Sequence, residues 1–162
     1  MKRILMIIMV FFPIISWGQS VPGWVKNPPK SNGKIYAVGV GTSGSAEIAE
    51  RKAKMEASVN LAEQLETAVV SVTTKFEPVV RRNKTLTEKV KVVRKTVVAT
   101  LQNTQVSQKF ATEENGIHKV YVLMEMPRKN VNRSIIDQVE KDKELHKALS
   151  NSKAYKKVIA EQ

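Results

Sequence analysis

Residues 34–53 read KIYAVGVGTSGSAEIAERKA, an apolar run that passes through glycines into an alanine-rich segment. The run Ile35–Val40 is suited to a buried strand, and the segment after it has the composition of a helix. Gly39, Gly41 and Gly44 have the G-x-G-x-x-G spacing of dinucleotide-binding turns, where glycines let the backbone approach a pyrophosphate at a helix N-terminus. The stretch therefore predicts a strand, a turn and a helix, and it raises the question of whether a nucleotide binds there.

The helix is predicted to be long and amphipathic. Ser45 is a suitable N-cap, and Glu47 lies in the first turn, where the helix dipole favours an acid. Apolar residues then recur at spacings of three, four and seven until Pro78, which must end or interrupt the helix. This apolar face consists of Ile48, Met55, Val59, Ala62, Leu65, Val69, Val72 and Phe76.

The rest of the pattern argues against a nucleotide site. A dinucleotide-binding fold needs an acidic residue about 20 positions after the turn, at the end of a second strand. Glu63 has that separation but falls in the middle of the predicted helix. A phosphate loop is excluded because no Gly-Lys-Ser/Thr follows the glycines. We therefore predict that the glycines allow a tight strand-to-helix turn with close helix packing, and we expect no cofactor.

A helix and a hairpin complete the predicted domain. The apolar spacing from Leu86 to Leu101 indicates a second helix, with a strand as the alternative because β-branched residues are frequent there. Two strand-like runs flank Asn115 and Gly116, which tolerate the positive φ angles of a two-residue hairpin turn. Pro127 closes the hairpin. This order of elements predicts an α+β fold in which helices pack on a small antiparallel sheet.

The N-terminus has the layout of a secretory signal. Lys2 and Arg3 precede twelve residues of apolar character, Ile4–Ile15. Such a segment rises only about 18 Å as a helix, whereas the hydrocarbon core of a membrane is about 30 Å thick. We expect a signal peptide over residues 1–18, cleaved after Gly18, with an uncleaved anchor as the alternative.

The remaining chain divides into three predicted parts. An extended lead-in covers 19–34, the α+β domain covers 35–127, and a charged helical extension covers 128–162. The extension is predicted to hold one weakly amphipathic helix over 131–149 and a short basic tail. The residues expected to support the fold are Trp24, Tyr36, Gly39, Gly41, Asn115 and Gly116.

The residue types give no sign of catalysis. The chain has no cysteine, and its two histidines, His118 and His146, lack neighbours at metal-ligand spacing. The acidic residues alternate with lysines or lie beside a turn, which is typical of solvated faces. We therefore expect no enzymatic activity, no catalytic residue, no metal and no small-molecule substrate.

Positive charge is concentrated in one segment. The net charge of +12 falls to +10 when Lys2 and Arg3 are removed, and residues 75–109 hold nine Lys or Arg against two Glu. This segment is a candidate contact surface for an anionic membrane or polymer, with a solvated face as the alternative. No aromatic residue lies between Phe76 and Phe110, which disfavours nucleic acid as the partner. The candidate contact residues are Arg81, Arg82, Lys84, Lys91, Arg94 and Lys95.

Four motifs together resemble the Lpp-twenty lipoprotein family. They are Pro22-x-Trp24, IYAVGVG at 35–41, AEIAERKAKMEASVNLAEQL at 46–65 and NGIHKVYVLMEMP at 115–127. The resemblance covers Pro22 to Pro127. It implies an SHS2-like α+β domain, an exported location in the periplasm or at the outer membrane, no enzymatic activity and, by analogy with flagellar relatives, assembly into membrane-associated rings or disks.

One departure concerns the anchor. The family's lipoproteins carry a lipidated cysteine after the signal, whereas Gln19 and Ser20 stand at that place here. Lipidation through cysteine is therefore not expected. The leading hypothesis is a non-enzymatic envelope protein that forms a homo-oligomer or docks on an envelope partner. The alternative is a periplasmic or surface module whose basic face binds an anionic polymer or lipid headgroup.

Overall fold

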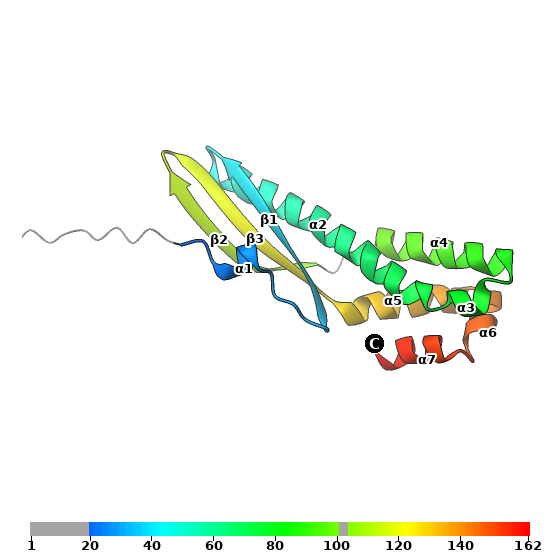
Figure 1. The fold of residues 1–162 in the computed structure, drawn as a ribbon. Helices are drawn as coiled ribbons and strands as arrows, with labels where there is room; N and C mark the ends of the chain where they lie inside the picture. Colours follow the sequence, from blue (N-terminus) through cyan, green and yellow to red (C-terminus); the bar gives the residue numbers. More distant parts are fainter. Residues whose placement is uncertain (1–19, 101–103) are drawn as a thin grey trace, which may run out of the picture.

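The computed structural model describes residues 20–100 and 104–162, so the predicted signal peptide lies outside the described residues. Figure 1 shows an elongated molecule with a sheet at one end, a helical bundle at the other, and one long helix that belongs to both. The elements are α1 (Gly23–Lys26), β1 (Lys34–Ser43), α2 (Ala46–Thr74), α3 (Glu77–Val80), α4 (Lys84–Thr100), β2 (Gln105–Glu114), β3 (Ile117–Pro127), α5 (Arg128–Lys141), α6 (Lys143–Leu149) and α7 (Lys153–Ala160). The predicted α+β class with an antiparallel sheet is confirmed.

The sheet is antiparallel with the order β1-β3-β2. Asn115 and Gly116 have φ angles of 52° and 73°, which are the positive values that the two-residue turn between β2 and β3 requires. The predicted hairpin is therefore confirmed. The register places Val38 and Phe110 on either side of β3, opposite Leu123 and Tyr121.

β1 and α2 are in direct backbone contact. Gly39 and Gly41 face the helix, and a Cβ atom on either would collide with the backbone of α2; at Gly41 it would lie 2.6 Å from the amide nitrogen of Ala53. The predicted close packing is confirmed, but these glycines lie inside β1 and not in a turn. The chain turns at Gly44, and Ser45 takes the N-cap position without a side-chain capping bond.

The first half of α2 buries a different face from the one predicted. Ala49, Ala53 and Ala57 are fully buried against the strand. Ile48, Met55 and Val59 point outward and are 42%, 66% and 54% exposed, and Ala62 is also exposed, so the prediction is wrong for these positions. The reason is steric, because a strand backbone that touches the helix backbone leaves room only for alanine.

The second half of α2 follows the prediction. Leu65 and Val69 are buried and Val72 is half-buried, and Phe76, two residues past the end of α2, is buried as well. The second predicted helix is confirmed as α4, which packs against α2 and α5, and the strand alternative is excluded for its described residues.

The C-terminal part forms three helices where one helix and a tail were predicted. The chain breaks at Asp142, whose carboxylate accepts from the amides of Glu144 and Leu145 and so caps α6. The predicted basic tail is the helix α7, and its Tyr155 is buried with the ring centre 6.0 Å from that of Phe76. The buried cluster thus continues from β3 into α5, α6 and α7.

The lead-in lies against the sheet. It was predicted to be extended, but Gly23–Lys26 form the helical turn α1, which contacts β3 and holds the half-buried Trp24. On the sheet face away from α2, Lys34 Nζ lies 2.7 Å from Oε1 of the buried Glu125, and this pair joins β1 to β3.

Candidate functional site

The six basic candidates lie in two separate places. Arg81 and Arg82 follow α3 and Lys84 begins α4, at the end of the bundle furthest from the sheet. Lys91, Arg94 and Lys95 lie further along α4, where they face α2. The sequence predicts one basic segment, whereas the structure divides it into two surfaces.

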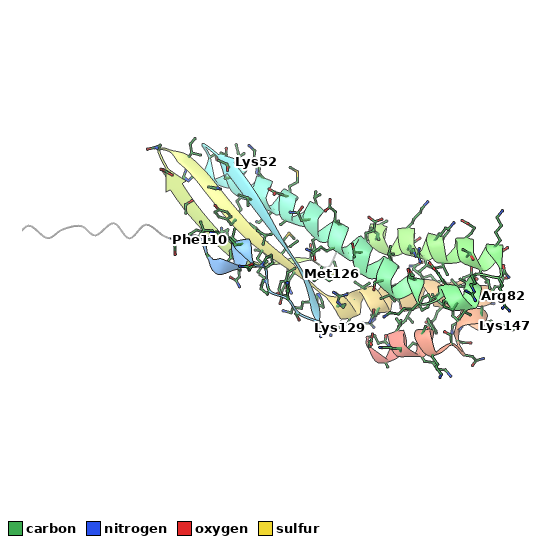
Figure 2. The ribbon with its side chains drawn as sticks, in the orientation of Figure 1. Lys52, Arg82, Phe110, Met126, Lys129 and Lys147 are labelled. Atoms are coloured by element: carbon green, nitrogen blue, oxygen red, sulfur yellow. The ribbon has the colours of Figure 1, made fainter. Side chains whose placement is uncertain are left out.

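The first surface is the basic tip, formed by Arg81, Arg82, Lys84 and Lys147. Lys147 belongs to α6, which packs against α3, and Figure 2 shows it at the same end of the molecule as Arg82. All four side chains are exposed, and none takes part in the ion pairs formed within residues 20–100 and 104–162. Sequence reasoning missed Lys147 because it is distant along the chain.

The second surface is the α2–α4 groove, a recess of about 480 Å³ between the two helices. Its lining residues recur at helical spacings of three and four on each helix, which places them on facing sides. They are Glu66, Val69 and Val70 from α2, and Lys91, Arg94, Lys95, Val98 and Ala99 from α4. The groove therefore has an apolar floor with positive charge along the α4 side.

The guanidinium group of Arg94 is held by hydrogen bonds to neighbouring side chains of the same chain. Its Nε donates to Thr73 Oγ1 at 2.6 Å, and its Nη2 lies 3.3 Å from Thr74 Oγ1 and 3.1 Å from Glu77 Oε1. These bonds tie α4 to the end of α2 and to α3. Lys91 and Lys95 are exposed along the rim, and Lys91 Nζ lies 2.8 Å from Glu88 Oε1. That hydrogen bond holds the pKa of Glu88 below its usual value.

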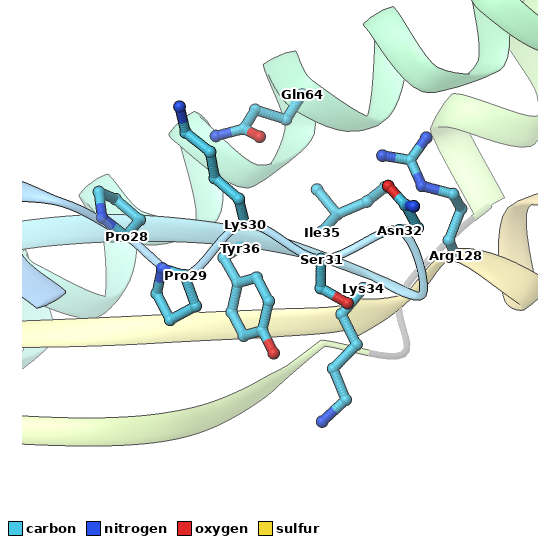
Figure 3. Close-up of a pocket in the computed structure, with 10 residues that line it drawn as sticks. All are labelled: Pro28, Pro29, Lys30, Ser31, Asn32, Lys34, Ile35, Tyr36, Gln64 and Arg128. Atoms are coloured by element: carbon cyan, nitrogen blue, oxygen red, sulfur yellow. The ribbon is translucent and has the colours of Figure 1, made fainter.

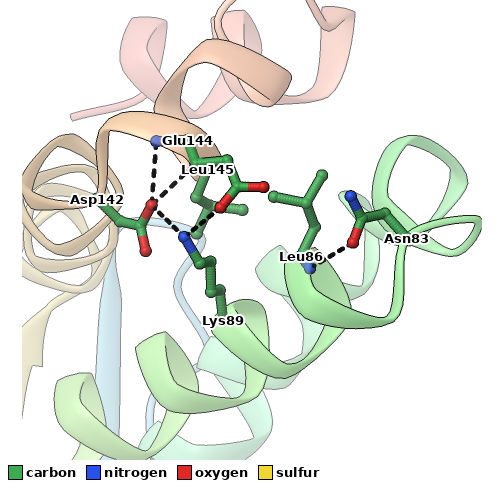
Figure 4. A network of polar contacts seen from close by, with 6 residues as sticks. All are labelled: Asn83, Leu86, Lys89, Asp142, Glu144 and Leu145. Carbon is green, nitrogen blue, oxygen red and sulfur yellow. Dashed lines mark hydrogen bonds and ion pairs between the residues drawn. The ribbon is translucent and has the colours of Figure 1, made fainter.

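Lys89, on the other side of α4, belongs to a structural network (Figure 4). Its Nζ donates to Asp142 Oδ1 at 2.9 Å and to Glu144 Oε2 at 2.7 Å. The hydrogen bond to Glu144, followed by that to Asp142, raises the pKa of Lys89. Asp142 also accepts from the backbone amide of Leu145, which is the main cause of its lowered pKa. The network joins α4 to the start of α6.

A second hollow of about 440 Å³ lies where the lead-in meets β1 (Figure 3). Tyr36, one of the predicted structural residues, lines it together with Lys30 and Lys34. In Figure 3 Lys30 points toward Gln64 of α2, whereas Lys34 and Tyr36 point to the other side. Lys34 is already paired with Glu125. Because its polar groups do not converge, this hollow is a weaker candidate than the groove.

The described residues contain no group of three or more possible metal ligands and no helix long and apolar enough to cross a membrane. Of the two histidines, His118 lies beside the hairpin turn with its Nδ1 3.5 Å from Oε2 of Glu113, and His146 packs with its ring centre 6.0 Å from that of Tyr155. Beside Gly39 and Gly41, the backbone of α2 occupies the space that a pyrophosphate would need.

Comparison with known families gives one match. A family model described as LPP20 lipoprotein matches residues 22–127, which run from the lead-in through β3. No curated protein and no solved structure gives a significant match to the chain.

Proposed function

The chain belongs to the LPP20 lipoprotein family, which indicates an exported protein of the cell envelope, and on that premise we propose that it has a non-enzymatic, structural role. It self-associates, or docks on an envelope partner at the outer membrane, through the outward face of α2. The chain has no cysteine. The proposal therefore places it in the periplasm or at the outer membrane through protein contacts and not through a lipid on cysteine.

The observation that carries this proposal is the α2 stripe, formed by Ile48, Met55 and Val59. These side chains share one side of the helix, and each is at least two-fifths exposed. Aligned apolar side chains on a surface are a feature of protein interaction sites. A lone exposed valine would need no such explanation.

The charges beside the stripe suit a second copy of the same chain. On one flank of the stripe Glu47 Oε1 lies 3.1 Å from Arg51 Nη2, and on the other flank Lys52 and Glu56 follow Ile48 at helical spacing, so both signs of charge occur on each side of it. A two-fold interface brings the same surface together from both copies and must be complementary to itself. A stripe flanked by both signs meets that requirement when two α2 helices lie antiparallel.

The test is the size of the chain lacking residues 1–18, measured by light scattering over a wide concentration range. Met55→Lys combined with Val59→Lys should raise the dissociation constant of the assembly by about tenfold or more. Val92→Lys is the matched control, because Val92 is a 61% exposed valine on another helix. A chain that stays monomeric at every concentration and captures no envelope protein would contradict the proposal.

A second candidate function rests on the basic tip. Its four cations, Arg81, Arg82, Lys84 and Lys147, suit an anionic polymer or lipid headgroup. Binding to phosphatidylglycerol vesicles should weaken steeply as salt rises, because exposed charges are screened over about 8 Å at physiological ionic strength. If replacing Arg81, Arg82 and Lys84 together by Gln left vesicle binding unchanged, this candidate would fail.

A further inference from the structure

The α2–α4 groove leaves apolar surface in contact with water between two helices that otherwise pack together. Val69 forms its fully buried floor, Val70 is 39% exposed, Val98 is half-buried and Ala99 is exposed. Removing this surface from water is favourable, in proportion to the apolar area covered. An apolar occupant would therefore gain free energy from the groove.

The rim determines the charge of the occupant. Lys91 and Lys95 are one helical turn apart, so both ammonium groups lie on the same side of α4. Arg94 lies between them in sequence and lines the same groove, whereas Glu66 is the one acid among the lining residues described. The pair of Lys91 with Glu88 is more than half exposed on both sides, and such pairs are weak enough for a ligand to displace.

We infer that the groove binds a single-chain anionic amphiphile, with its carboxylate or phosphate between Lys91 and Lys95 and its hydrocarbon chain along Val70, Val98 and Ala99. This inference goes beyond the proposed function and does not depend on it, because the α2 stripe is not part of the groove lining. It also departs from the expectation that the chain takes no small molecule, since the groove is visible only when α2 and α4 are packed.

The shape favours one bound molecule over a membrane surface. The apolar side chains lie in a recess and the lysines extend along its edge, whereas a membrane-contacting helix presents its apolar side chains outward. The volume of about 480 Å³ is within the range of small-molecule sites. A peptide backbone suits the groove less well, because among the lining residues described only the Glu66 side chain can accept from its amide N–H groups.

Titration of dodecanoate, below its micelle concentration, into the chain lacking residues 1–18 tests this inference. Calorimetry should give saturable binding of one molecule per chain, and amide chemical shifts should change in residues 66–70 and 91–99. Dodecyl phosphate should bind at the same place, and dodecyltrimethylammonium should not bind there, because its charge is opposite.

Two matched pairs of variants locate the site. Lys91→Gln with Lys95→Gln should weaken dodecanoate binding by about tenfold. Arg82→Gln with Lys84→Gln removes the same charge from the basic tip and should change the affinity by less than about twofold. Val70→Glu should weaken binding, whereas Val92→Glu should not, because Val92 lies outside the groove.

Several outcomes would overturn the inference. Absence of saturable dodecanoate binding would do so. Equal losses of dodecanoate affinity in the Lys91/Lys95 variant and in the Arg82/Lys84 variant would also do so, because they would indicate general charge attraction. Chemical shift changes centred on Met55 and Val59 would assign the amphiphile to the α2 stripe instead. Binding to phosphatidylglycerol vesicles without binding to dodecanoate would show a membrane surface and not a site for one molecule.

Discussion

The two halves of α2 pack by opposite means. At the sheet end, Ala53 and Ala57 lie directly on the backbone of Gly39, and no side chain separates helix from strand. At the bundle end, the same helix leads into Phe76, whose ring meets Tyr155 from the last helix of the chain. The first contact requires small side chains, and the second requires large ones that fill the space between helices.

This difference explains why the large apolar residues of α2 are buried in one half and exposed in the other. Where the helix touches the strand backbone, only small side chains fit, so Met55 and Val59 lie on the outside. Where helices face one another across wider gaps, large side chains such as Leu65 fill the core. Substitutions that add or remove volume should therefore act oppositely at the two ends.

Phe76→Ala should have the largest effect. The side chain is fully buried, and removing a buried phenyl ring costs about 3–5 kcal/mol of the free energy of unfolding, through lost burial and the cavity left behind. Urea denaturation measures the change. Val79→Ala is the control in the adjoining turn, because Val79 is 40% exposed. Similar losses in the two variants would show that the bundle end is not packed as described.

Gly41→Ala should destabilise the sheet end by about 2–3 kcal/mol, since overpacking forces the backbone apart. The added Cβ would meet the backbone of Ala49 and Ala53, which cannot move as the tip of a side chain can. Gly44→Ala has no atom within 4 Å of the new Cβ and should change stability by less than about 0.5 kcal/mol. A Gly41→Ala variant as stable as the unmodified chain would disprove the backbone contact.

Asp142→Ala should cost about 1 kcal/mol at neutral pH, because it removes the N-cap of α6. The effect should also depend on pH. The folded-state pKa of Asp142 is lowered, so its contribution is fully present above its unfolded value of about 3.9 and disappears as pH falls through the folded pKa.

The two ends can be compared in acid by urea denaturation between about pH 6 and pH 2. The variant should lose less stability over this range than the unmodified chain. Some acid dependence should remain from the sheet end, where the hydrogen bond from Lys34 lowers the pKa of Glu125. If Asp142→Ala left the pH dependence unchanged, the carboxylate would not be ionised and bonded as the structure indicates.

Met55→Gln should have the smallest effect, below about 0.5 kcal/mol, because a surface substitution removes little burial. The residue is two-thirds exposed although it belongs to the apolar pattern of the sequence. Leu61→Gln, on the buried face of the same helix, is the contrasting variant and should lose several times more. Equal losses would mean that α2 is rotated from the orientation described.

Features that depend on residues adjacent in the sequence were predictable. Asn115 and Gly116 specify the hairpin turn because few other residues tolerate positive φ at two successive positions. The helical period of α4 predicted the helix that the structure shows, although its β-branched residues had left a strand as the alternative. By contrast, the break at Asp142 was missed, because the apolar spacing continues across it and gives no sign of a new helix.

The candidate site was less predictable, because its parts come from distant segments. The lysines of the groove are visible as charge in the sequence, but Val70 joins them only when α2 lies beside α4. Lys147 joins Arg82 at the basic tip in the same way, through the packing of α6 on α3. No local pattern marks either pairing.

The sequence by itself determined the types of β1, α2, β2 and β3, the hairpin turn, the absence of thiol chemistry and the excess of positive charge, because each of these depends on residue identity or on short-range geometry. Only the tertiary structure decided which face of α2 is buried. Periodicity shows that a helix has an apolar side, but the distance to its partner selects the side chains that fit between them. Here Gly39 and Gly41 reduce that distance to backbone contact, so the alanines face inward and the large apolar side chains lie on the exposed face.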